Sequence, residues 1–127
     1  MSDIELEHVN VTVSDPQKSA NMLCALFGWK IRWHGQTPMG LTYHVGTEKS
    51  YIAVYRGARS NPNNQDSYST IASLNHIAVV VDDLDEIENR VKEAGFIPQN
   101  HGNYEPGRRF YFDDQDGIEF EVVSYRS

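Results

Sequence analysis

The chain has 127 residues, about the size of one ordinary domain, which excludes two independently folded domains of typical size. Hydrophobic residues make up 39% and charged residues 23% of the chain, and this composition excludes a disordered or fibrous protein. The balance of 11 Lys+Arg against 18 Asp+Glu gives a formal net charge of −7, which argues against nucleic acid as a partner.

The first predicted element is a strand over residues 8–13, in which β-branched residues alternate with other side chains. A helix follows, because Asp15 and Pro16 are typical of an N-cap with proline at the first helical position. Apolar residues then recur at helical spacing until Gly28 ends the helix. The strand-like segments after this helix are residues 29–33, 41–45 and 51–55.

The segment 57–70 comes next and contains turn-forming residues throughout, with almost nothing to bury. We interpret it as a linker. Beyond it, residues 76–81 predict a second strand of the first kind, and Asp83 caps a second helix that ends at Gly95. The strand-like segments that follow are residues 96–97, 109–112 and 118–124.

The two halves of the chain form an internal sequence repeat. Residues 4–28 align with residues 72–95 when His8 is placed opposite His76. Each half has the element order βαβββ, so we predict an α+β fold of two tandem modules. The modules are expected to form a curved, partly open mixed sheet, with the helices outside.

The predicted organisation is a single domain over residues 1–127. Module one covers about residues 4–56, and module two covers about residues 71–126. Because the sheet formed by two docked modules stays partly open, we expect a homodimer whose contacts complete or cover the site.

Strand alternation predicts which side chains point away from the helices. The β-branched face of each first strand should pack on its helix, so His8 and His76 lie on the opposite face. If the modules pack about a pseudo-twofold axis, these histidines meet at one site. A strand histidine taken alone is more often a surface or hydrogen-bonded residue than a metal ligand.

Two histidines at equivalent places favour a metal site, which a carboxylate from a nearby inward face would complete. Glu119 and Glu121 share such a face of the last strand. The chain has one cysteine, Cys24, so a disulfide framework and a zinc site made of cysteines are excluded. Histidine and carboxylate ligands with open positions suit Fe(II), Mn(II) or another divalent ion.

The doubled module resembles the vicinal oxygen chelate superfamily, which includes glyoxalase I, fosfomycin-resistance enzymes, extradiol dioxygenases and bleomycin-resistance proteins. The resemblance is carried by HVNVTVSDPQKSANMLCALFGW at 8–29, NHIAVVVDDLDEIENRVKEAG at 75–95 and RRFYFDDQDGIEFEVVSY at 108–125. The last stretch is similar to the family's closing signature, in which a metal-binding glutamate follows a turn glycine. Here the glycine is Gly117 and the glutamate is Glu121.

The resemblance implies a divalent metal ion (Fe, Mn, Ni or Zn) held by His8, His76 and Glu121, with Glu121 also a candidate for catalytic proton transfer. The fourth ligand of glyoxalase I would fall on Tyr51 or, after a register change, on Lys49 or Ala53. None of these is a usual ligand, although Glu48 lies close by in the sequence. The three-ligand pattern is closer to that of the dioxygenases and fosfomycin-resistance enzymes.

The resemblance also implies a pocket for a small-molecule substrate. Tyr51 and Tyr43 are candidates for its lining, and ordinary strand packing is the alternative for both. Arg108 and Arg109 lie where the family often binds anionic substrate groups, with a solvated surface as the alternative.

Two functions follow from these observations. The first is a divalent-metal enzyme, a glyoxalase-like lyase or isomerase or a dioxygenase, that acts on a small oxygen-chelating substrate with the metal as Lewis acid. The alternative is a metal-free binding or sequestration protein of the bleomycin-resistance type. No basic segment followed by an apolar run opens the chain, and no run approaches the ~20 apolar residues of a membrane span, so we expect a cytoplasmic protein with no membrane partner.

Overall fold

The structure is a computed structural model that describes residues 3–62, 65–104 and 107–126. The chain divides into two compact units, residues 1–61 and residues 62–127, and each is described by itself. The first unit contains β1 (His8–Thr12), α1 (Pro16–Phe27), β2 (Lys30–Gln36), β3 (Leu41–Gly46) and β4 (Tyr51–Arg56). The second contains β5 (Ile77–Val80), α2 (Leu84–Glu93), β6 (Gln99–Tyr104), β7 (Gly107–Asp113) and β8 (Glu119–Ser124).

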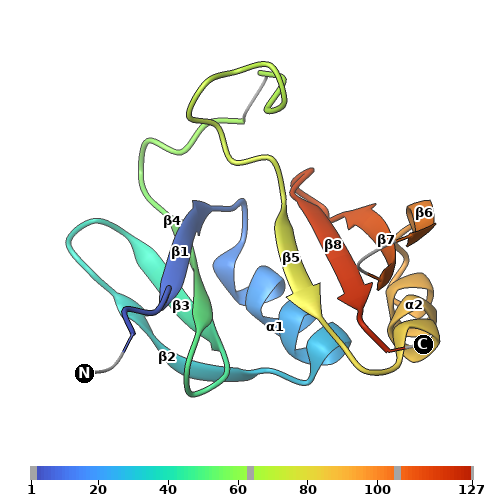
Figure 1. Ribbon diagram of the computed structural model, residues 1–127. Coiled ribbons are helices and arrows are strands. Elements are labelled where there is room, and N and C mark those ends of the chain that lie inside the picture. The colour runs from blue at the N-terminus through green and yellow to red at the C-terminus, as the bar shows by residue number, and fades with distance from the viewer. Residues whose placement is uncertain (1–2, 63–64, 105–106, 127) are drawn as a thin grey trace. The chain divides into compact units, whose positions relative to one another are not determined.

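Each unit has one open four-stranded sheet, and the two sheets have the same topology (Figure 1). The strand order is β1-β4-β3-β2 in the first unit and β5-β8-β7-β6 in the second. In each sheet the first strand runs parallel to the last, and the other neighbours are antiparallel. The predicted α+β fold of two tandem βαβββ modules is confirmed.

Helix α1 begins and ends where the sequence predicts. The Asp15 side chain accepts a hydrogen bond from the backbone N–H of Lys18 at 3.1 Å, which satisfies one of the free donors of the first turn. At the other end Gly28 adopts a left-handed conformation with φ of 69°, and its N–H donates to the carbonyl of Cys24. Helix α2 is capped by Asp83 in the same way. The Asp83 side chain accepts a hydrogen bond from the backbone N–H of Glu86.

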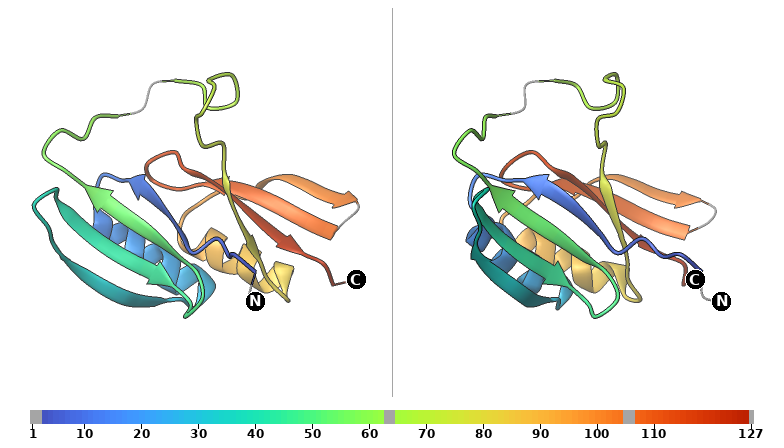
Figure 2. Two further views of the ribbon diagram at one scale, coloured as in Figure 1. Left: turned by 60° about the vertical axis from the view of Figure 1, so that its left-hand side comes forward. Right: turned by 90° about the vertical axis from the view of Figure 1, so that its left-hand side faces the viewer.

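One face of each sheet packs on the helix of its own unit (Figure 2). The apolar residues buried in the first unit include Ala20, Leu23 and Leu26 of α1 and Val45, Ile52 and Val54 of the sheet. Those of the second include Leu84, Ile87 and Val91 of α2 and Phe110, Phe112, Phe120 and Val122 of the sheet. This packing leaves the other face of each sheet for the predicted site residues.

The prediction of a strand at Phe96 and Ile97 is wrong. The ring of Phe96 packs against Phe112 with centroids 5.7 Å apart, and β6 begins only at Gln99. Its sequence, QNHGNY, is polar and has no apolar alternation, so its strand conformation comes from backbone pairing with β7. Neither helix in the described parts of the chain has the length and apolar character needed to cross a membrane.

Candidate functional site

Glu121 lies in the middle of β8, on the face of the second sheet that points away from α2. Its strand neighbours are Ala78 of β5 and Tyr111 of β7, and the side chains of Phe120 and Val122 point to the opposite, helix-covered face. Glu121 is only 6% exposed. A buried carboxylate needs charged or hydrogen-bonding partners to offset the loss of water.

Those partners include Arg109, His76 and the side chain of Tyr111. Arg109 donates from Nη1 to Oε2 of Glu121 at 2.8 Å, and Nε2 of His76 lies 3.0 Å from Oε1. The structure therefore brings together His76 and Glu121, the two predicted metal ligands of the second module. It places Arg109, predicted to bind substrate, against the carboxylate of Glu121.

Arg109 is held on several sides. Its side chain is 12% exposed, its guanidinium lies 4.8 Å from the ring centre of Tyr104, and Nη2 donates to the carbonyl of Gly107. The Nε atom is buried without a hydrogen-bond partner among the described residues. Desolvation opposes the charged form, yet Tyr104 and Glu121 raise the pKa of Arg109 above its ordinary value. A fixed positive charge therefore lies beside Glu121.

His76 is contacted by two tyrosines. The ring edge of Tyr111 meets the imidazole at an interplanar angle of 83°, and the Tyr68 hydroxyl lies 3.3 Å from Nδ1. Tyr68 also donates to both carboxylate oxygens of Glu119, at 2.9 and 3.0 Å. Desolvation and Glu119 raise the pKa of Tyr68 to about 12, so its hydroxyl keeps its proton at neutral pH.

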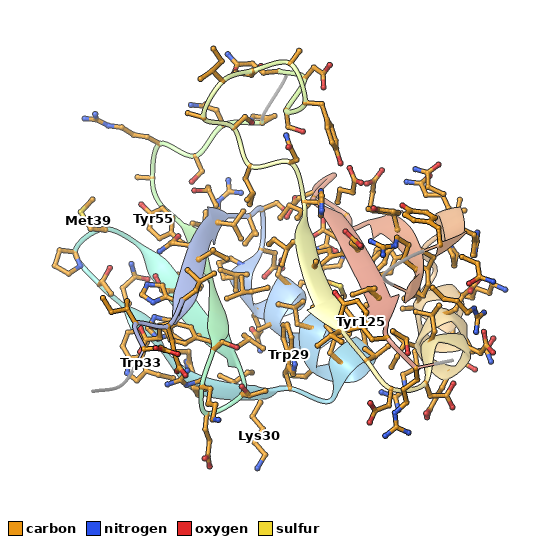
Figure 3. The ribbon with its side chains drawn as sticks, viewed as in Figure 1. Trp29, Lys30, Trp33, Met39, Tyr55 and Tyr125 are labelled. Carbon is orange, nitrogen blue, oxygen red and sulfur yellow. The ribbon has the colours of Figure 1, made fainter. Side chains whose placement is uncertain are left out.

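The corresponding face of the first module carries an aromatic platform, which we define as His8, His44, Tyr51 and Trp33. The rings of His8 and His44 stack on Tyr51 with centroids 4.7 and 4.6 Å apart, and the guanidinium of Arg32 lies 4.3 Å from the Tyr51 ring centre. Figure 3 shows Trp33 beside this sheet, and its ring contacts His44. Burial lowers the pKa of His44, with a further lowering from His8 and Arg32, which favours a neutral imidazole.

Two predicted substrate residues lie away from these faces. Tyr43 pairs with Val54 on the helix-covered face of the first sheet and is nearly buried, so it does not share a surface with Tyr51. Arg108 points away from Arg109 and donates to Asp85 of α2 at 3.0 Å.

The strand register identifies the first-module counterpart of Glu121. Tyr51 pairs with His8, whereas Glu121 lies two residues further along its strand, opposite Ala78. Ala53, opposite Asn10, is therefore the counterpart of Glu121, and Tyr51 is the counterpart of Glu119. Of the alternatives for a fourth ligand, the register selects Ala53, which has no donor atom in its side chain.

The spacing of His76 and Glu121 fits a metal ion. Two ligands at about 2.1 Å from an octahedral ion and at right angles to each other lie about 3.0 Å apart. The separation of Nε2 and Oε1 is 3.0 Å, so the pair matches two adjacent coordination positions. Among residues 3–62, 65–104 and 107–126, no group of three or more His, Cys, Asp or Glu side chains is placed to hold a metal ion. The structure therefore shows His76 and Glu121 as a pair of candidate ligands and not as part of a complete triad.

The sequence matches the model of the Glyoxalase/Bleomycin resistance protein/Dioxygenase superfamily over residues 5–122. The chain belongs to this superfamily. The predicted resemblance is thereby confirmed at the level of the family. No curated protein matches the chain significantly.

Solved structures of the superfamily share the fold. A glyoxylase/bleomycin resistance protein/dioxygenase domain from Frankia sp. EAN1pec is 23% identical, with a TM-score of 0.83 over 98% of this chain and 100% of that chain. TnmS3, an antibiotic binding protein from Streptomyces sp. CB03234, is 19% identical, with a TM-score of 0.76 over 98% of both chains. The fosfomycin resistance protein FosX from Listeria monocytogenes is 20% identical, with a TM-score of 0.70 over 97% of this chain and 94% of that chain.

Sequence reasoning did not single out three of the residues that surround the predicted ligands. Tyr111 could have been found, because alternation along β7 places it on the face of Arg109 and opposite Glu121. Arg32 lies in an exposed strand, and Tyr68 lies in a linker without periodicity. No pattern in the sequence indicates that Arg32 contacts the ring of Tyr51 or that Tyr68 contacts the ring of His76.

Proposed function

We propose that the protein is a divalent-metal-dependent enzyme that acts on a small molecule able to chelate the ion through oxygen. The proposed ligands are His76 and Glu121 in the second module and His8 in the first. The observation that carries the proposal is the 3.0 Å separation of His76 Nε2 and Glu121 Oε1 on a sheet face without a helix. A bound divalent ion would supply Lewis-acid stabilisation of negative charge on a substrate oxygen.

Arg109 supports this assignment of Glu121. Its hydrogen bond occupies Oε2, which leaves Oε1 directed at His76. Carboxylates that bind metal are usually hydrogen-bonded in this way, because the second partner fixes their orientation. We therefore propose that Arg109 orients Glu121 rather than binding an anionic substrate.

The absence of a carboxylate at Ala53 bears on the reaction. Proton shuttling between two carboxylates requires a second acidic side chain within hydrogen-bond reach of the substrate, and Ala53 cannot supply it. We propose a reaction that does not need proton transfer between two carboxylates, because Glu121 is the only carboxylate at the two equivalent strand positions. The aromatic platform around Tyr51 is proposed to contact a planar or unsaturated part of the substrate.

A metal-free binding protein is the second candidate, and one observation favours it. Glu121 is already paired with both Arg109 and His76, so its charge has partners without an ion. A ring-lined surface of the kind seen around Tyr51 suits flat aromatic ligands.

Stoichiometric binding of Mn²⁺ tests the choice. We expect about one ion per chain in the wild type and loss of that binding in His76→Ala and Glu121→Gln, because each removes a ligand. His101→Ala is the matched control, since His101 forms a similar 2.8 Å contact with Glu88 elsewhere in the same module. Free Mn²⁺ is measured by electron paramagnetic resonance. A wild type without bound ion, or full occupancy in His76→Ala, contradicts the enzyme proposal and leaves the binding protein.

A further inference from the structure

We infer that Tyr68 is a positioning residue for His76, and that it determines which imidazole nitrogen carries the proton. The inference rests on the proposed metal site and extends it to the linker between the modules. Tyr68 is the only aromatic residue of the segment 57–70, and its hydroxyl reaches both His76 and Glu119.

The direction of the hydrogen bonds follows from the number of protons available. A tyrosine hydroxyl has one proton to donate, and an ionised carboxylate can only accept. The hydroxyl of Tyr68 donates that proton to Glu119, at 2.9 and 3.0 Å from its two oxygens. Its contact with Nδ1 of His76 at 3.3 Å must then be one in which Nδ1–H donates to the tyrosine oxygen.

This arrangement determines the role of the other nitrogen. With a proton on Nδ1, the neutral imidazole has its lone pair on Nε2, 3.0 Å from Oε1 of Glu121. The contact between Nε2 and the carboxylate oxygen is favourable at this separation when a cation, either a proton or a metal ion, lies between them. The chain Glu119–Tyr68–His76 therefore prepares Nε2 as a metal ligand, as the hydrogen-bond partners of metal-binding histidines usually do.

The linker is built to hold Tyr68 in place. The backbone N–H of Tyr68 donates to the side chain of Asp66 at 3.0 Å, and the side chain of Asn75 donates to the carbonyl of Ser67 at 2.7 Å. Tyr68 itself is 61% exposed, so its ring contributes little to the core. Its position is better explained by the hydroxyl contacts than by packing.

Tyr68→Phe removes the hydroxyl and keeps the ring. We expect Mn²⁺ affinity to fall about 10-fold, the lower end of the range for loss of such a partner. Tyr125→Phe is the matched control, because Tyr125 is equally exposed at 61% and lies just after β8 (Figure 3). It should bind Mn²⁺ like the wild type, and both variants should keep the wild-type unfolding midpoint.

A spectroscopic measurement separates positioning from a general structural effect. In ¹⁵N-labelled protein loaded with Zn²⁺, which is diamagnetic, the wild type should show Nε2 of His76 bound to the ion and a slowly exchanging Nδ1–H. In Tyr68→Phe the Nδ1–H should exchange rapidly with water, because its acceptor is gone. An unchanged Nδ1–H signal together with wild-type Mn²⁺ affinity overturns the inference.

Glu119 provides an independent test. Glu119→Gln keeps an acceptor for Tyr68 and should retain affinity close to that of the wild type. Glu119→Ala leaves the Tyr68 proton free to turn toward Nδ1, which favours the wrong tautomer, so affinity should fall as in Tyr68→Phe. Equal affinities in the two Glu119 variants contradict the inference. A wild type that binds no ion refutes the proposed metal site itself, whereas normal binding in the wild type and in Tyr68→Phe refutes only the role of Tyr68.

Discussion

Arg108 and Arg109 are neighbours on β7, but their side chains meet different environments. Arg109 points to the face of Glu121, where its side chain is nearly buried and paired with a buried carboxylate. Arg108 points to the other side and pairs with Asp85, and both of these side chains are exposed. Removing an arginine therefore has different consequences at the two positions, because only one of them leaves a buried charge without its partner.

We expect Arg109→Ala to destabilise the protein several times more than Arg108→Ala. The exposed pair of Arg108 should contribute no more than about 0.5 kcal/mol, since water screens it. Urea unfolding of both variants measures the difference. Equal midpoints would show that Arg109 is not needed to compensate Glu121 in the folded protein.

The sequence predicts some of these contacts but not others. Alternation and the repeat place His76 and Glu121 on one face, and the structure brings them to 3.0 Å. Tyr43 was expected to line a pocket with Tyr51, but it lies on the helix-covered face of its sheet. Tyr68 was not predictable, because its position depends on hydrogen bonds within an irregular segment.

At the scale of elements, prediction succeeded where apolar residues decide the structure. Strands β3, β4 and β8 and both helices have buried apolar residues at the spacing of their element, and each lies within a few residues of its predicted bounds. Strand β6 lacks such residues, and its strand conformation depends on backbone pairing with β7 alone. Its location depends on pairing with the next strand of the hairpin, which periodicity within the β6 segment does not show.

The turn between β7 and β8 contains a buried carboxylate with a different role from that of Glu121. Asp114 is 7% exposed, and its Oδ1 accepts from the backbone N–H groups of Asp116 and Ile118, both at 2.9 Å. Gly117, in the same turn, has φ of 80°, a conformation that favours glycine. Burial raises the pKa of Asp114 despite these two hydrogen bonds.

We expect Asp114→Asn to stabilise the protein at neutral pH. A carboxyl whose pKa is raised by folding contributes stability below its ordinary pKa, and this contribution is lost as the pH rises through the raised value. Asparagine keeps an oxygen acceptor for the turn and carries no charge to desolvate. Urea midpoints at pH 3 and pH 7 should therefore show an advantage of Asp114→Asn that grows with pH. An advantage that shrinks as the pH rises would contradict this account.

At the scale of the whole molecule, the repeat produces two units that are each small. A unit of roughly sixty residues buries a modest share of its surface and is marginally stable alone. Each sheet is covered by a helix on one face, and each has its first strand, β1 or β5, at an edge. Edge strands and half-covered sheets are the features that proteins protect by further packing.

We therefore predict that the protein is a homodimer in which a second copy covers part of this surface. Exposed apolar side chains in the second unit, Leu74 and Val80 among them, are candidates for burial on association. Light scattering at micromolar concentration should give twice the chain mass of 14.5 kDa. If folding and association are coupled, the thermal midpoint should also rise with protein concentration, because mass action favours the dimer. A single species of 14.5 kDa with a concentration-independent midpoint would contradict the predicted dimer.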